Sequence, residues 1–418
     1  MKILRIERTL ANLLIISFTI KFIFFLFGIE GIRINFPLSI FEAWRDYIYA
    51  YIPTVQAFKN GYLPYKDFYH AYPPLFLYFL TLFSFIPCFW SIALPLVIFD
   101  ALTLIPVYFI SNHFFSSDKA FFISLIFALA PINLFYIDFL WLNPSLTTFF
   151  LLLSIYFFIK EKYDISAINF AISIGFKQTS LLALPIMLLF LLKKKSFKYA
   201  LKYFIIVLSI CFLFSIPYIF LEPRLYLFSI FRIPFNIEEL PKNYFQLGFF
   251  TEPFEYDTIN TATLKWYELK MMKYVPLNAP INLFLPIFIF ILPENFSNLY
   301  FSIDYVMRFF FFITYILLLY NIHKKKQFQD NFLIKSVLYS LLIFFIFNPI
   351  YKYYVAGITP LLILLNQKKK NFVIFEIFNI ALILIPRIFT SYLLLLLFLL
   401  LLKFQSNNLN LEKRIDKK

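Results

Sequence analysis

The side chains best suited to chemistry lie in one short stretch, residues 41–75, between the first two apolar runs of the chain. This stretch contains Glu42, Arg45, Asp46, Lys59, Lys66, Asp67 and His70. Carboxylates and imidazoles transfer protons, and ammonium and guanidinium groups bind anions. Since the flanking sequence is nearly all apolar, we expect these polar groups to lie at the mouth of a membrane bundle, where such a protein acts.

Asp46 is our candidate for a general base. The alternatives are a simple ion pair with the neighbouring Arg45, or solvation at the membrane interface. The presence of Lys66 and His70 in the same loop favours a role beside a bound phosphate. A carboxylate there accepts a proton while the cations neutralise the anion.

Two more polar segments interrupt apolar runs. GFKQTSLLALP, residues 175–185, contains Lys177 and Gln178, and FNPIYKYYVAGITP, residues 347–360, contains Lys352 and Tyr353. A lysine at the centre of a membrane helix costs about 2.5–3.5 kcal/mol by insertion scales, unless it snorkels to the interface. Together with the acidic loop, these segments indicate an anionic ligand at the outer surface, with a lipid phosphate the obvious one.

The elements that position these residues are membrane helices. Hydrophobic residues make up 61% of the chain and the mean hydropathy is +0.78, against about 45–50% apolar residues in soluble domains. We expect an all-α, polytopic integral membrane protein of about 11–13 transmembrane helices forming one domain over residues 1–403. The expected spans are 9–29, 73–90, 91–112, 119–137, 144–160, 165–192, 200–221, 304–322, 332–348, 353–367, 371–386 and 388–403.

The net charge of +15 does not indicate nucleic acid, because the basic residues cluster in short loops. By the positive-inside rule the N- and C-termini are cytoplasmic and residues 404–418 form a basic cytoplasmic tail. The large loops 30–72 and 222–280 are then external. This topology predicts a protein of the cell membrane with its active site on the extracytoplasmic face.

For two stretches the sequence does not decide how the chain crosses the membrane. Residues 165–192 form either one long helix or two short ones that meet near Lys177. The second alternative places Lys177 at a membrane face and requires an even number of crossings over 73–137, where three apolar runs occur. Residues 281–293 are too short to span and are interpreted as re-entrant or interfacial. Cys88 and Cys211 lie in separate apolar runs, so we expect neither a disulfide nor a metal cluster.

These segments also resemble a known family. RDYIYAYIPTVQAFKNGYLPYKDFYHAYPPL is similar to the first lumenal loop of polyprenyl-phosphate-sugar-dependent glycosyltransferases of the GT-C superfamily, notably the first mannosyltransferase of the GPI-anchor pathway and its relatives. GFKQTSLLALP resembles the "F-K…LP" segment of that family, and FNPIYKYYVAGITPLL its late "F-N…Q-Y…LP" segment. LAPINLFYIDFLWLNPS, residues 129–145, is a looser match to its second external loop.

The resemblance implies an inverting transfer of a hexose, with mannose as the first expectation, from a polyprenyl or dolichyl phosphate to a lipid-linked or other extracytoplasmic acceptor. Asp46 is then the base, and Arg45, Lys66, His70, Lys177, Gln178, Lys352 and Tyr353 are the expected substrate-binding residues. The family carries Asp-x-Asp where this chain has Trp44-Arg45-Asp46. One carboxylate is a poor cage for Mg²⁺ or Mn²⁺, although Glu42, one turn away, would supply a second oxygen ligand.

Two other classes of protein remain as alternatives. A transporter or lipid flippase would use the same charges as a substrate path, and it predicts polar residues through the depth of several helices together with repeat symmetry. A membrane scaffold without catalysis predicts that changing Asp46 has no effect on glycolipid products.

The charge pattern predicts the sidedness of each basic loop. A fluorescent-protein fusion after Lys326 should be bright because that loop is cytoplasmic, and an alkaline-phosphatase fusion within residues 222–280 should be active because that segment is external. Measuring both reporters at both positions in intact cells checks the prediction. The opposite pattern at either position would refute the topology.

Overall fold

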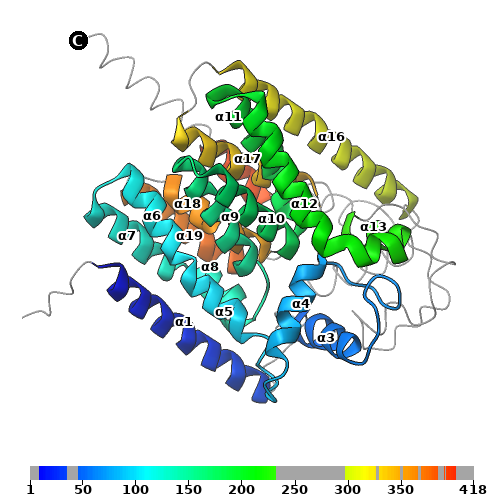
Figure 1. Ribbon diagram of the computed structural model, residues 1–418. Coiled ribbons are helices and arrows are strands. Elements are labelled where there is room, and N and C mark those ends of the chain that lie inside the picture. The colour runs from blue at the N-terminus through cyan, green and yellow to red at the C-terminus, as the bar shows by residue number, and fades with distance from the viewer. Residues whose placement is uncertain are drawn as a thin grey trace, which may run out of the picture.

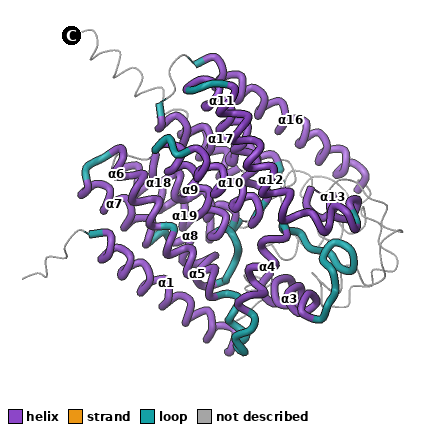
Figure 2. Tube along the Cα trace, viewed as in Figure 1, coloured by secondary structure: helices purple, strands orange, loops and turns teal. Residues whose placement is uncertain are grey.

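The computed structural model describes residues 9–34, 46–231, 297–325, 329–348, 352–365, 369–384, 390 and 392–401. Helices joined by loops make up this described part of the chain (Figure 2). Six helical stretches there are long and apolar enough to cross a membrane: Leu10–Arg33, Leu94–Phe114, Ser117–Phe139, Phe197–Leu221, Val306–Lys324 and Asp330–Phe347. The expected all-α, polytopic membrane fold is therefore confirmed.

The first helix, α1 (Leu10–Arg33), runs along the outside of the bundle (Figure 1). It begins at Thr9, whose side chain accepts the backbone N–H of Asn12 at 3.3 Å. Its buried residues recur every three or four positions and therefore form one face. They are Leu13, Ser17, Lys21, Phe25, Gly28 and Gly31.

The described part of the first loop is folded onto one end of the bundle. Asp46 begins a continuous helical stretch that consists of a π-helical turn, η1 (Tyr47–Tyr51), and α3 (Ile52–Lys59). A tight turn follows, in which Gly61 takes a φ of +89°, as its lack of a Cβ permits. The next helix, α4 (Pro74–Phe83), starts with proline at its first position, as the sequence predicts.

The expected span 73–90 is wrong. α4 has only ten residues, about half the length needed to cross the hydrocarbon core of a bilayer. The chain leaves the helix at Ser84, whose carbonyl accepts Lys59 Nζ at 3.2 Å. It therefore stays at the end of the bundle where the first loop lies, and Pro87 occurs in the irregular segment that follows.

The central bundle comprises the next elements. They are α5 (Leu94–Leu102), α6 (Leu104–Phe114), α7 (Ser117–Ala128), α8 (Pro131–Asn133), η2 (Leu134–Phe139), α9 (Ser145–Ile159), α10 (Tyr163–Phe176), η3 (Gln178–Ala183), α11 (Leu184–Lys194), α12 (Phe197–Leu221) and α13 (Pro223–Phe231). Five more described helices follow: α16 (Ser297–Lys324), α17 (Asp330–Phe347), α18 (Tyr354–Leu365), α19 (Lys369–Leu384) and the helix Tyr392–Leu401. In Figure 1, α3, α4 and α13 lie together at one end, and α16 packs on the outside beside α11 and α17.

The stretch 165–192 forms two helices, the second of the two alternatives. α10 ends at Phe176, and α11 begins only at Leu184, after the short 3-10 helix η3. Lys177 Nζ bonds the carbonyl of Asn143, which directly precedes α9, and Lys195 pairs with Glu161, just past the end of α9, at 2.8 Å. α9, α10 and α11 therefore run back and forth between two distinct ends of the bundle.

A polar cluster joins three helices of this bundle. The Tyr203 hydroxyl of α12 lies 3.3 Å from Ser154 Oγ of α9 and 3.2 Å from Ser166 Oγ of α10. The two serine hydroxyls lie 3.1 Å apart. All three side chains are buried, so these bonds have no competition from water.

Tyr203→Phe should lower the thermal stability of the protein in detergent micelles. The change removes the hydroxyl that bonds both serines and preserves the ring, so we expect a loss of about 0.6–1.7 kcal/mol, the range for hydrogen bonds between membrane helices. Tyr199→Phe is the matched control, because Tyr199 lies one turn away on the same helix with its side chain exposed. Equal melting temperatures for the two variants would contradict the prediction.

Candidate active site

Lys177 lies at the break between α10 and η3, in extended backbone conformation and only 4% exposed. Its Nζ donates to the carbonyl oxygen of Asn143 at 3.2 Å. The same Nζ lies 3.4 Å from the centroid of the Tyr354 ring and 4.9 Å from that of Tyr353. A carbonyl and two aromatic faces thus surround this ammonium group, which gives it cation–π partners in place of water.

A row of tyrosine hydroxyls continues from Asn143. The backbone N–H of Asn143 donates to the Tyr51 hydroxyl at 3.2 Å. The Tyr51 hydroxyl lies 3.4 Å from that of Tyr72, which lies 3.2 Å from that of Tyr353. This row connects η1, the approach to α4 and the start of α18, three segments far apart in the sequence.

Asp46 precedes η1 and is partly exposed. Its carboxylate interacts electrostatically with Lys177 and with Tyr51, Tyr72 and Tyr353. The described structure therefore brings the expected base together with two of the segments that the sequence singles out, 175–185 and 347–360. A carboxylate at the rim and an ammonium group beneath it are suited to accept a proton and to hold an anion.

His70 belongs to the same end of the bundle but differs from the expected cation. It is only 3% exposed, and its ring contacts those of Tyr65 and Tyr72. Burial lowers the pKa of His70 to about 3, so the imidazole is neutral at pH 7. It lines a cavity of about 10 Å³, room for about one water molecule. The other lining residues are Ala50, Tyr51, Thr54, Val55, Tyr72, Phe76, Leu77 and Leu80.

The remaining expected site residues have different surroundings. Gln178 Nε2 donates to the carbonyls of Ala71 at 3.2 Å and Ile230 at 2.9 Å, so this amide links η3 to the first loop and α13. Lys352 is buried beside Tyr353, and its Nζ donates to the Ile383 carbonyl at 3.3 Å. Lys66 is exposed in the turn after Tyr65.

Arg45 and Glu42 lie outside the described residues. Within the described ranges, no three His, Cys, Asp or Glu side chains gather in a way that would hold a metal ion. Asp46 is thus the one expected metal ligand whose position the structure gives.

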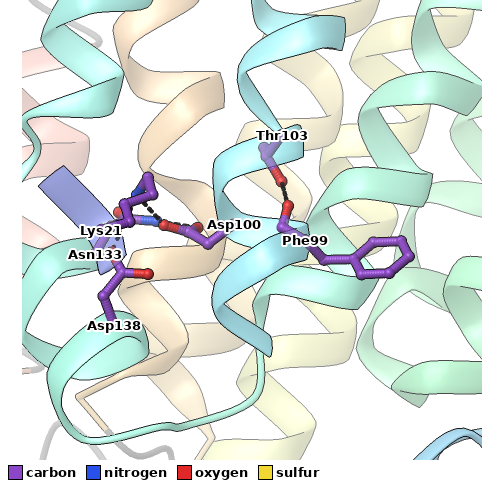
Figure 3. Close-up of polar contacts among 6 residues, drawn as sticks. All are labelled: Lys21, Phe99, Asp100, Thr103, Asn133 and Asp138. Carbon is purple, nitrogen blue, oxygen red and sulfur yellow. Dashed lines mark hydrogen bonds and ion pairs between the residues drawn. The ribbon is translucent and has the colours of Figure 1, made fainter. Parts of the chain in front are cut away.

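Sequence reasoning missed a buried ionic cluster (Figure 3). Lys21 of α1 is fully buried, pairs with Asp100 of α5, and lies 3.1 Å from the Asp138 carboxylate of η2. Asn133 Nδ2 donates to the second oxygen of Asp100 at 3.0 Å. Lys21 and Asp100 interrupt two expected apolar spans, and Asp138 directly follows a third. Opposite charges in or beside separate apolar spans were the sequence signal for this ion pairing.

Asn143 was missed as well. Its side chain is fully buried, and neither its Oδ1 nor its Nδ2 has a hydrogen-bond partner among the described residues. An unpaired buried carboxamide costs about 1–3 kcal/mol for each group left unsatisfied. Its backbone contacts Lys177 and Tyr51, so this unsatisfied side chain belongs to the cluster around Lys177.

Comparison with known proteins supports the same class. The family model of the ALG3 protein, from the dolichyl-phosphate-mannose-dependent mannosyltransferases of the GT-C type, matches residues 45–236. This range contains Asp46, His70 and Lys177. A search of the curated proteins gives no match.

Two crystal structures of the Archaeoglobus fulgidus oligosaccharyltransferase are also similar to the chain. One is tethered to an acceptor peptide containing the NVT sequon, with 13% identity and a TM-score of 0.41, and the other is the apo form, with 12% and 0.43. Each alignment covers 90% of this chain and, respectively, 54% and 55% of that protein. The chain thus spans about half its length, and TM-scores this low carry no argument.

The family match over residues 45–236 supports the class of protein expected from the sequence, a membrane glycosyltransferase of the GT-C type. Within that class, the family model that matches the chain is the one described as ALG3 protein.

The buried, neutral His70 predicts a dependence of stability on pH. The folded pKa of about 3 lies below the unfolded value of about 6.5, so the unfolded state alone binds a proton as the pH falls below 6.5. Between pH 7.5 and 5.5 the wild type should therefore lose about 1.4 kcal/mol more stability than His70→Gln. Thermal unfolding of both proteins at the two pH values measures this difference, and identical pH dependence would refute it.

Proposed function

We propose that the protein transfers a hexose, with mannose as the first candidate, from a polyprenyl or dolichyl phosphate to a lipid-linked or other extracytoplasmic acceptor. The observation that carries the proposal is the electrostatic interaction of Asp46 with Lys177 at one end of the bundle, within the range that matches the ALG3 protein. That end of the bundle carries the described part of the first loop, and we propose that it meets the lipid-borne donor at the membrane surface.

The proposed chemistry needs few groups. The acceptor oxygen forms a bond to the anomeric carbon while the bond from that carbon to the phosphate oxygen breaks. The acceptor proton passes to the Asp46 carboxylate. The phosphate leaves as a stable anion, and Lys177 stabilises the charge that builds on it. A single in-line displacement inverts the configuration at the anomeric carbon.

The other expected residues take supporting parts in this proposal. Tyr353 and the Tyr72 and Tyr51 hydroxyls offer donors beside Lys177. Lys352, Lys66, His70 and Arg45 are proposed to contact donor or acceptor, and Gln178 to hold the first loop in place through its two carbonyl contacts.

Asp46→Asn should abolish sugar transfer while leaving donor binding nearly unchanged, because the amide has a similar shape but cannot accept the proton. The assay uses protein in lipid nanodiscs, dolichyl-phosphate mannose with labelled mannose, and a mixture of polyprenyl-diphosphate oligosaccharides as acceptors. We expect a loss of at least about a hundredfold in turnover, as for removal of a general base.

Asp164→Asn is the matched control, because Asp164 is an exposed carboxylate in an ion pair with Lys202 near the opposite end of the bundle. Full turnover by Asp46→Asn would overturn its role as the base. Transport of the labelled lipid across vesicles without any transfer by the wild type would favour a flippase instead.

A further inference from the structure

We infer that Lys21 is a positioning residue for the transfer reaction. Through Asp138 it fixes the segment 139–143, on which both Lys177 and the η1 turn after Asp46 rest. This inference depends on the proposed function. It assigns a role in the reaction to a helix, α1, that lies on the outside of the bundle and contributes no group to the site.

Lys21 attaches α1 to the rest of the bundle. Most of this helix faces outward, with Phe22, Ile23, Leu26 and Phe27 exposed. In contrast, Lys21 is completely buried between Asp100 and Asp138 and lies 5.4 Å from the centroid of the Phe127 ring. A lysine so enclosed has lost its water, so the two carboxylates must be held within reach of it.

α1 also contacts the residues that directly follow Asp138 along the chain. Gly28 of α1 lies directly against them. A Cβ at this position would lie 2.5 Å from the Phe139 carbonyl oxygen and 2.9 Å from Trp141 Nε1. Phe25 packs on the Trp141 ring, with 5.5 Å between centroids. α1 therefore contacts η2 and the following residues by an ion pair, a close backbone approach and an aromatic contact.

Trp141 and the residues after it contact the candidate active site. Trp141 has a φ of +58°, a costly conformation for a residue other than glycine, so its surroundings must impose it. Its ring packs edge to face on Tyr47, the residue after Asp46, at 4.8 Å. Two residues later, Asn143 bonds Tyr51 through its N–H and Lys177 through its carbonyl.

These contacts connect Lys21 to both groups of the proposed reaction. η2, which carries Asp138, and η1, which follows Asp46, are both π-helical turns, a rare geometry that is frequent at functional sites. If the ion pair that holds η2 is lost, the segment 139–143 gains freedom, and the base and the cation lose their common support. The donor-binding surface itself remains.

The test is a neutral triple variant, Lys21→Met with Asp100→Asn and Asp138→Asn. These substitutions conserve size and leave no buried charge unpaired, so the fold should be retained. With the same labelled donor and acceptor mixture, we expect kcat to fall at least about tenfold, which corresponds to about 1.4 kcal/mol of transition-state stabilisation, and the KM for dolichyl-phosphate mannose to change less than twofold.

The matched control is Lys194→Met with Asp330→Asn, which removes an ion pair at the other end of the bundle and should leave kcat unchanged. Equal kcat values for the triple variant and the wild type would overturn the inference, as would a loss in the control as large as in the triple variant. A wild type without transfer activity would refute the proposed function instead.

Gly28→Ala decides the question if the triple variant does not fold. It changes no charge and adds one methyl group against Phe139 and Trp141, so it should displace the same segment. We expect the same fall in kcat at nearly constant KM. Unchanged kcat in a folded Gly28→Ala protein would overturn the inference.

Discussion

The structure depends on how a low-dielectric bundle accommodates buried ammonium groups. A charge removed from water must find partners, and the bundle provides two kinds. Lys21 forms ion pairs with two carboxylates, which compensate its charge fully. Lys177 has a carbonyl and aromatic faces, which stabilise a cation without neutralising it. The partly exposed Asp46 acts on Lys177 electrostatically, so the charge of Lys177 is compensated less closely than that of Lys21, in keeping with the proposed binding of an anion.

The break at Lys177 is the geometric counterpart of that difference. A continuous helix from α10 to α11 would have placed this residue on a helix surface inside the bundle. Because the chain is extended at Lys177, its side chain reaches the carbonyl just before α9, and the tyrosines from two distant loops enclose it. The fold thus gathers segments that are far apart in the sequence around Lys177.

The sequence was sufficient to predict the fold class and the grouping of Asp46 with the segments at 175–185 and 347–360, because charges in apolar runs are rare and mark functional positions. It left the break near Lys177 as one of two alternatives, and the structure decides between them. It was insufficient for α4, since ten apolar residues at the end of a bundle look like the start of a span. Lys21 was overlooked because its neighbours are so apolar. The burial of the Asn143 amide results from tertiary packing alone, so no local sequence pattern predicts it.

The π-helical turn after Asp46 has a consequence for how this site tolerates change in chain length. Each residue of an α-helix turns the chain by about 100°, and a π-helical turn accommodates one residue beyond the α-helical count. Deleting one residue within Tyr47–Tyr51 would therefore restore regular α-helical winding while Asp46 keeps nearly its present phase relative to α3. Deleting one residue from α3 itself would instead rotate Asp46 by about 100° relative to the residues beyond the deletion, so the direction in which the carboxylate points is set by helical phase.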